Sequence, residues 1–172
     1  MEKWVVAQEH IYTLEVENKF IISEHVSLKE ATKSNTAQRL GIDNFPDSDT
    51  LLTMKITAEH VFEPLRNKIG EPIYITSFYR SPELNKAIGG STKSQHCLGE
   101  AIDIDDVYSK ANNVDYFNYI KDYLEFDQLI WEFGDDNNPA WVHVSYSLGN
   151  NRMRVLKAIK ENNKTKYILW NQ

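Results

Sequence analysis

The chain has 172 residues and a mass of 20.0 kDa, and 41% of its residues are hydrophobic, so it can bury one sizeable core and is near the usual size of one domain. Its formal net charge is -6 and its pI is about 5.4, with lysines and arginines scattered among acids. This excludes the basic stripe that a nucleic acid or an anionic membrane would require. The single cysteine, Cys97, cannot form an internal disulfide. We therefore expect one monomeric domain with neither a nucleic-acid nor a membrane partner.

The N-terminal segment, residues 1–19, mixes β-branched and aromatic residues with charges, and it is predicted to form a strand or a loosely packed arm. Residues 20–172 are then expected to form the folded domain. The first ten residues include acids and polar groups, and no apolar run in the chain approaches membrane-spanning length. The sequence therefore predicts neither a secretion signal nor a membrane span.

Helical signals dominate the first half of the domain. Residues 27–40 read as one helix that begins at a Ser/Glu pair with capping-box spacing and is stopped by Gly41. Apolar residues recur at helical spacing through residues 51–65, which predicts a long helix with a kink near Pro64 and an end at Gly70.

Strand signals dominate the second half, where β-branched and aromatic runs are bounded by turn residues. The last two runs flank an Asn-Asn pair and are expected to form a hairpin. Strands are expected at residues 72–76, 101–105, 128–133, 141–146, 153–159 and 166–170, and short helices at residues 81–87 and 116–124. Helices early in the chain and adjacent strands late predict an α+β domain, with helices packed on a mainly antiparallel sheet.

The most informative segment is SQHCLGEAIDI at residues 94–104, which sets His96 and Asp103 around a glycine turn. Alternation along a strand turns Asp103 away from its two isoleucine neighbours, so it can face a cleft while they enter the core. The same alternation turns His143 away from two valines. Two ring nitrogens and one carboxylate oxygen would leave one open position on a tetrahedral zinc ion, as in catalytic zinc sites.

Several motifs in order, spread over residues 20–170, carry a family resemblance. They are SNTA at 34–37, GIDNFP at 41–46, ITSFYRSPELN at 75–85, GG at 89–90, the 96–103 segment and WVHVS at 141–145. The sequence resembles the zinc D-alanyl-D-alanine carboxypeptidase family, which includes L-alanyl-D-glutamate endopeptidases and shares its fold with the hedgehog signalling domain. Small, phage-type members are the most similar.

The resemblance implies an endolysin-like zinc peptidase that cuts a D-amino-acid-containing bond in the stem peptide of bacterial peptidoglycan, as a carboxypeptidase or an endopeptidase. His96, Asp103 and His143 would hold one zinc ion, and Ser94 would help to hold the substrate. Arg80 would stabilise the oxyanion, a role that suits a fixed guanidinium. Trp141 could line the substrate cleft.

The general base follows less directly from the resemblance. Many relatives carry an acid three positions before the last histidine, where this chain has Ala140. Glu132 is the nearest substitute, but a simple hairpin register would turn it away from that histidine, so a shifted register or a bulge is required. Asp135 and Asp136, in the connecting loop, are the alternatives.

A second class of function is a catalytically inactive domain, stabilised by metal, that binds a partner or builds a virion. Ala140 favours that interpretation. For a wall-cutting enzyme without a secretion signal, we expect residence in the host cytoplasm until lysis or a holin-like pore releases it, delivery with the virion, or a missing precursor segment.

Overall fold

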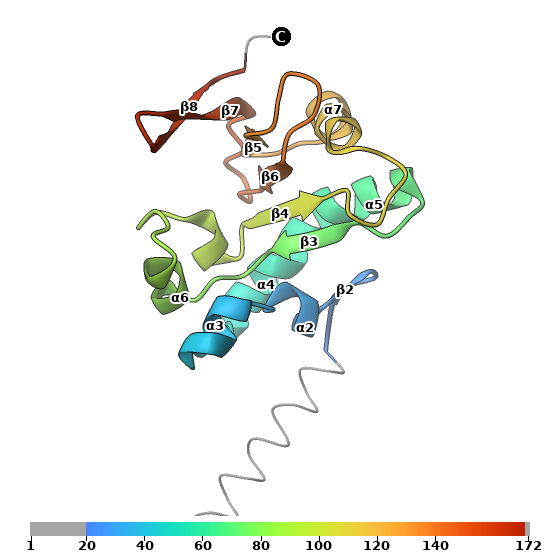
Figure 1. The fold of residues 1–172 in the computed structure, drawn as a ribbon. Helices are drawn as coiled ribbons and strands as arrows, with labels where there is room; N and C mark the ends of the chain where they lie inside the picture. The colour runs from blue at the N-terminus through green and yellow to red at the C-terminus, as the bar shows by residue number, and fades with distance from the viewer. Residues whose placement is uncertain (1–19, 171–172) are drawn as a thin grey trace, which may run out of the picture.

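The computed structural model describes residues 20–170, so the arm expected at residues 1–19 lies outside the described part. Within that part the chain has an α+β fold, as predicted, with a six-stranded sheet and helices packed against it (Figure 1). The helices of the first half lie beside β3 and β4, and α7 lies beside β5 and β6. No helix of residues 20–170 is long and apolar enough to cross a membrane.

The helix predicted for residues 27–40 is two helices, α2 (Leu28–Ala31) and α3 (Asn35–Leu40). The first helix begins where it was predicted: Ser27, which precedes α2, accepts a hydrogen bond from the Glu30 backbone. The chain breaks because Ser34 caps a new helix, with its hydroxyl accepting a hydrogen bond from the Ala37 backbone. The predicted stop at Gly41 is present in a left-handed conformation.

The long helix predicted for residues 51–65 is present but is not uniform. It consists of α4 (Ser48–Thr57), a π-helical turn η1 (Ala58–Phe62) and α5 (Glu63–Ile69). Pro64 has no backbone N–H, and its ring conflicts with the carbonyl four residues earlier in a regular α-helix. The wider π turn directly before Pro64 accommodates that conflict, where the sequence predicted a kink.

The six-stranded sheet has the order β3-β4-β6-β5-β7-β8, and every neighbouring pair is antiparallel except β5 and β7. The prediction of a mainly antiparallel sheet is therefore confirmed. A separate ribbon of β1 and β2 precedes α2. The strands are β1 (Ile21–Ser23), β2 (Val26–Ser27), β3 (Tyr74–Ser77), β4 (Ala101–Asp105), β5 (Gln128–Glu132), β6 (Trp141–Ser145), β7 (Arg154–Glu161) and β8 (Lys164–Leu169).

Three further helical segments connect the strands. α6 (Pro82–Ala87) follows β3, and η2 (Gln95–Leu98), a 3-10 turn, precedes β4. α7 (Asn113–Tyr123) begins three residues before its predicted start at residue 116, because Asn112 and Asp115 form a capping box that the sequence analysis did not identify.

The two faces of the sheet have different environments. One face packs on the helices and builds the main core, which includes Ile102, Leu129, Trp131, Val142 and Val144. Because side chains alternate along a strand, their neighbours point to the opposite face. That opposite face carries the polar residues of the candidate site.

Candidate active site

The three predicted metal ligands come together from three elements. Asp103 on β4 and His143 on β6 are paired residues of neighbouring strands, and His96 lies on η2, just before β4. His143 Nδ1 lies 2.7 Å from Asp103 Oδ1, and His96 Nε2 lies 3.2 Å from Asp103 Oδ2. One ligand atom from each residue lies within 4.8 Å of the other two, so one ion could contact all three.

The chemistry of these ligand atoms fits a metal ion. His96 Nδ1 lies 2.7 Å from the Phe78 carbonyl oxygen, which can only accept, so this nitrogen carries the ring proton. Burial lowers the pKa of His96, which keeps the ring neutral and leaves a lone pair on Nε2. That lone pair faces a carboxylate oxygen of Asp103, so two acceptors face each other without a proton between them. A cation between these acceptors would replace their repulsion by coordination.

The Asp103 carboxylate is held in its ionised form. Burial would raise the pKa of Asp103, but the contacts of the carboxylate, among them the hydrogen bond with the His143 ring, outweigh burial and hold the pKa well below its usual range. Arg80 also contacts this carboxylate, with its guanidinium nitrogen 2.5 Å from Asp103 Oδ2. The ligand is therefore ready to bind a cation at neutral pH.

The turn that carries His96 is fixed by a polar network around the residue before it. Gln95 donates to Asp127 Oδ2 at 2.9 Å and accepts from Gln128 at 2.7 Å. Asp127 is 2% exposed and is held by two hydrogen bonds of 2.6 Å from Arg152. Such connected, satisfied polar groups restrict the backbone of the turn and hence the direction of the imidazole.

The same turn ends at Gly99, which has a φ of +72° and no room for a side chain. A Cβ at this position would lie 2.6 Å from Met54 Cγ and 2.9 Å from the Thr50 carbonyl oxygen. We expect Gly99→Ala to cost about 1–2 kcal/mol for the left-handed backbone and a further 1–3 kcal/mol, roughly, for the overpacking. Urea unfolding followed by circular dichroism measures this loss.

Gly41→Ala is the matched control, because Gly41 has a similar φ of +66° but no atom within 4 Å of its added Cβ. It should show only the backbone cost. Equal losses in the two variants would mean that the close packing around Gly99 does not constrain the His96 turn.

Glu132 lies on the same face as His143. The structure pairs Glu132 with Trp141 and Ile130 with His143, one residue away from the simple pairing of Phe133 with Trp141. The strand ends at Glu132 because Phe133 has a φ of 53°, which leaves the strand conformation. The shifted register that the base assignment requires is therefore present.

Glu132 is 6% exposed and has an unusual charge environment. The pKa of Glu132 is raised to about 7, mainly by burial and in part by the negative charge of Asp103. The nearby cationic groups of His143, Arg80 and Lys160 oppose this rise and are included in that value. A carboxylate with a pKa close to the working pH can both accept and return a proton. Its backbone carbonyl accepts a 2.9 Å hydrogen bond from the backbone of Ala140, the position at which the family resemblance led us to expect an acid.

The two alternative acids of the connecting loop are engaged elsewhere. Asp135 accepts hydrogen bonds from the backbones of Asn137 and Asn138, and Asp136 pairs with Lys157 at 2.7 Å. Neither lines the cleft that contains Glu132.

A cleft of about 510 Å³ contains all seven predicted site residues: Arg80, Ser94, His96, Asp103, Glu132, Trp141 and His143. Trp141 forms one wall, with its ring centroid 5.4 Å from that of Phe133. The sequence analysis missed other lining residues, among them Lys93, Gln128, Ile130, Thr165 and Tyr167. All five lie outside the recognised motifs, and Thr165 and Tyr167 reach the cleft only because strands that are far apart in the sequence pair with one another.

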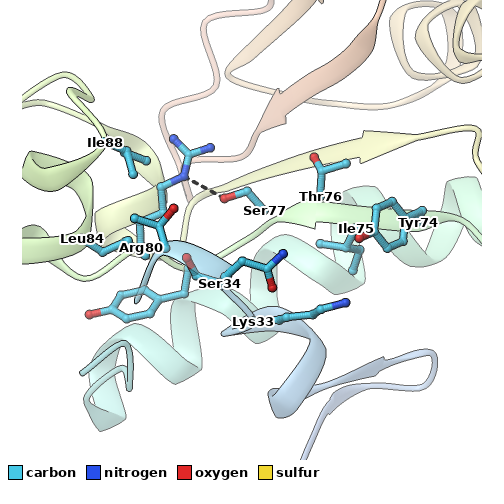
Figure 2. A pocket seen from close by; sticks show the side chains of 12 residues that line it. Lys33, Ser34, Tyr74, Ile75, Thr76, Ser77, Arg80, Leu84 and Ile88 are labelled. Atoms are coloured by element: carbon cyan, nitrogen blue, oxygen red, sulfur yellow. Dashed lines mark hydrogen bonds between the residues drawn. The ribbon is translucent and has the colours of Figure 1, made fainter. Parts of the chain in front are cut away.

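A second, smaller hollow of about 270 Å³ lies beside β3 and shares Arg80 with the cleft (Figure 2). Arg80 Nε donates to Ser77 Oγ at 2.7 Å, the dashed contact in Figure 2. The hollow contains none of the three candidate metal ligands. The hollow matters to the site because Ser77, one of its lining residues, fixes the orientation of the Arg80 guanidinium at the cleft.

A match to a protein-family model identifies the family of the chain. A family model described as Peptidase M15 matches residues 24–145, which is more than half of the chain. The chain belongs to the Peptidase M15 family. The match includes every predicted site residue and ends before β7, and no curated protein is significantly similar to the chain. As a member of this family, the protein is a peptidase.

Proposed function

We propose that this M15 peptidase is zinc-dependent and hydrolyses a D-amino-acid-containing bond in the stem peptides of bacterial peptidoglycan. The observation that carries the proposal is the convergence of His96, Asp103 and His143 in one cleft with the buried carboxylate of Glu132. The wall substrate follows from the resemblance to zinc D-alanyl-D-alanine peptidases.

In the proposed reaction, Glu132 accepts a proton from the attacking water while the water oxygen bonds to the peptide carbon. The same residue then returns the proton to the amine nitrogen as the carbon–nitrogen bond breaks. Arg80 directs a positive guanidinium toward the carbonyl oxygen, which becomes negative during the attack. Zinc, when bound, would lower the pKa of a water molecule and polarise the carbonyl. Ser94 and Trp141 would contact the peptide from the cleft walls.

We expect the purified protein to bind about one zinc ion, because two histidines and one carboxylate offer three ligands of the kind that zinc prefers. His143→Ala should reduce the zinc content to well below one per chain after dialysis. Elemental analysis of zinc-loaded protein measures both. His60→Ala is a suitable control, because His60 stacks on Tyr146 away from the candidate site. Full zinc occupancy in His143→Ala would refute the ligand assignment.

The alternative of an inactive, metal-stabilised domain rested on Ala140. The buried carboxylate of Glu132 in the cleft supports the peptidase instead, since it offers an acid from the neighbouring strand. Release of peptide fragments from purified peptidoglycan, measured by mass spectrometry with and without zinc, separates the two functions. An inactive domain would bind zinc and release nothing.

A further inference from the structure

The hairpin of β7 and β8 lies beyond the part of the chain that the family model matches. It nevertheless reaches the cleft, because β7 pairs in parallel with β5, the strand that carries Glu132. Two residues of β8, Thr165 and Tyr167, line the cleft. The hairpin is therefore an element of this chain that borders the proposed reaction site.

Strand register places Tyr167 in the same row as Glu132. Glu132 is paired with Ala158 on β7, and Ala158 is paired with Tyr167 on β8. Neighbouring strands lie about 4.8 Å apart, so the Tyr167 and Glu132 backbones are roughly 10 Å apart. Ala158 between them has a side chain of one carbon, which leaves the space above it to its longer neighbours. Tyr167 is 52% exposed and is available to a ligand in the cleft.

The same hairpin brings a cation to the rim of the cleft. Lys160 Nζ lies 3.1 Å from Thr165 Oγ1 and 4.9 Å from the centroid of the Phe133 ring, and both of these residues line the cleft. Among residues 20–170, no carboxylate lies within salt-bridge distance of Lys160. An ammonium group has three donors, so Lys160 can bind a further acceptor.

The charges of the cleft favour an acidic ligand. Its two carboxylates, Asp103 and Glu132, are assigned to the metal and to proton transfer, whereas Lys93 lines the cleft and Lys160 lies at its rim. Lys93 also lacks a carboxylate partner within the described part of the chain. A positively charged cleft rim in a chain of net charge -6 is a local feature that suits a negatively charged ligand.

We propose that the β7–β8 hairpin forms a substrate-binding wall for an acidic peptide, with Tyr167 packing on the peptide and Lys160 binding a free carboxylate. The proposal rests on the proposed function, since it assigns the peptide to the same cleft. An aromatic ring offers a rigid apolar surface with little entropy to lose, and an ammonium group beside a hydroxyl suits a carboxylate. Tyr167 and Lys160 are binding residues in this proposal and take no part in proton transfer.

The test uses zinc-loaded full-length protein and synthetic stem peptides in two forms, with free and with amidated carboxylates. We expect Tyr167→Ala to raise KM about tenfold with kcat changed less than about twofold, because truncation of an aromatic contact weakens ground-state binding. Tyr167→Phe should restore the wild-type KM, since it keeps the ring. Lys160→Gln should raise KM several-fold more for the free acid than for the amide.

Ile168→Ala is the matched control, because Ile168 neighbours Tyr167 on β8 but points to the other face of the sheet. It should leave KM and zinc content unchanged. An unchanged KM in Tyr167→Ala, or equal effects of Lys160→Gln on both peptides, would overturn the proposed wall while wild-type cleavage still supported the peptidase.

Calorimetric titration of zinc-loaded Glu132→Gln with the same peptides separates binding from turnover. Weaker binding when Tyr167→Ala is added would support the wall even if the wild-type protein cleaved nothing, a result that would refute only the proposed catalysis. If neither peptide form binds or is cleaved, both the proposed substrate and the wall are wrong.

Discussion

Replacing Glu132 with glutamine should leave zinc binding intact and reduce kcat by roughly two or more orders of magnitude, the usual contribution of a positioned general base. The amide has nearly the same shape as the carboxylate and can occupy the same buried position, where Glu132 is 6% exposed. It cannot accept a proton at neutral pH. Steady-state kinetics on a soluble stem peptide, together with elemental analysis, measures both effects.

Asp135→Asn is the matched control for Glu132→Gln, because it makes the same kind of change in an acid that lies outside the cleft. Its side chain accepts two backbone hydrogen bonds in the loop, so the variant should lose a little stability and retain turnover. A fully active Glu132→Gln enzyme would assign the proton transfer to a different residue.

The pH dependence of kcat gives a second test of Glu132. Only the ionised carboxylate can accept a proton, so activity should fall as the pH drops through its pKa. Burial raises the pKa of Glu132 from 4.5 to about 7, and a bound cation would lower it again, so the midpoint of this acid limb should lie between these values. The residual activity of Glu132→Gln should lack this limb.

The candidate metal ligands could be predicted from the sequence because the pattern that reveals them is local. Asp103 and His143 each stand between two apolar residues of a short strand, so strand alternation alone turns them away from the core. The structure then pairs these two residues directly across neighbouring strands. The helix-rich first half and the antiparallel pairs also followed from local periodicity and turn residues.

The remaining features depend on contacts between distant segments and had no local signal. The register of β5 on β6 is set where the chain leaves the strand at Phe133, and it decides whether Glu132 faces the cleft or the core. The parallel pairing of β5 with β7 brings Tyr167 to the cleft, although a hairpin signal alone cannot show which strand the hairpin joins. Strand order and register therefore limited the sequence analysis more than residue type did.

Replacing Arg80 with lysine should reduce kcat by about 100-fold or more, with a much smaller change in KM, if the guanidinium stabilises charge that develops only in the transition state. The structure shows why lysine is a poor substitute. Arg80 binds Ser77 Oγ through Nε and the Asp103 carboxylate through a terminal nitrogen, so the planar group is fixed at two points. A single ammonium group cannot reproduce this geometry.

Contact with Asp103 would give Arg80 a second role, that of orienting a metal ligand. A residue with that role affects metal affinity as well as turnover. Zinc affinity of Arg80→Lys, measured by competition with a chelator, separates the two tasks. A loss of kcat at full zinc occupancy would place the guanidinium at the oxyanion, and partial rescue of Arg80→Ala by added guanidinium would support the same role. Ser77→Ala removes one of the two fixed points and should lower kcat by less than Arg80→Lys does. An unchanged kcat in zinc-loaded Arg80→Lys would remove Arg80 from the mechanism.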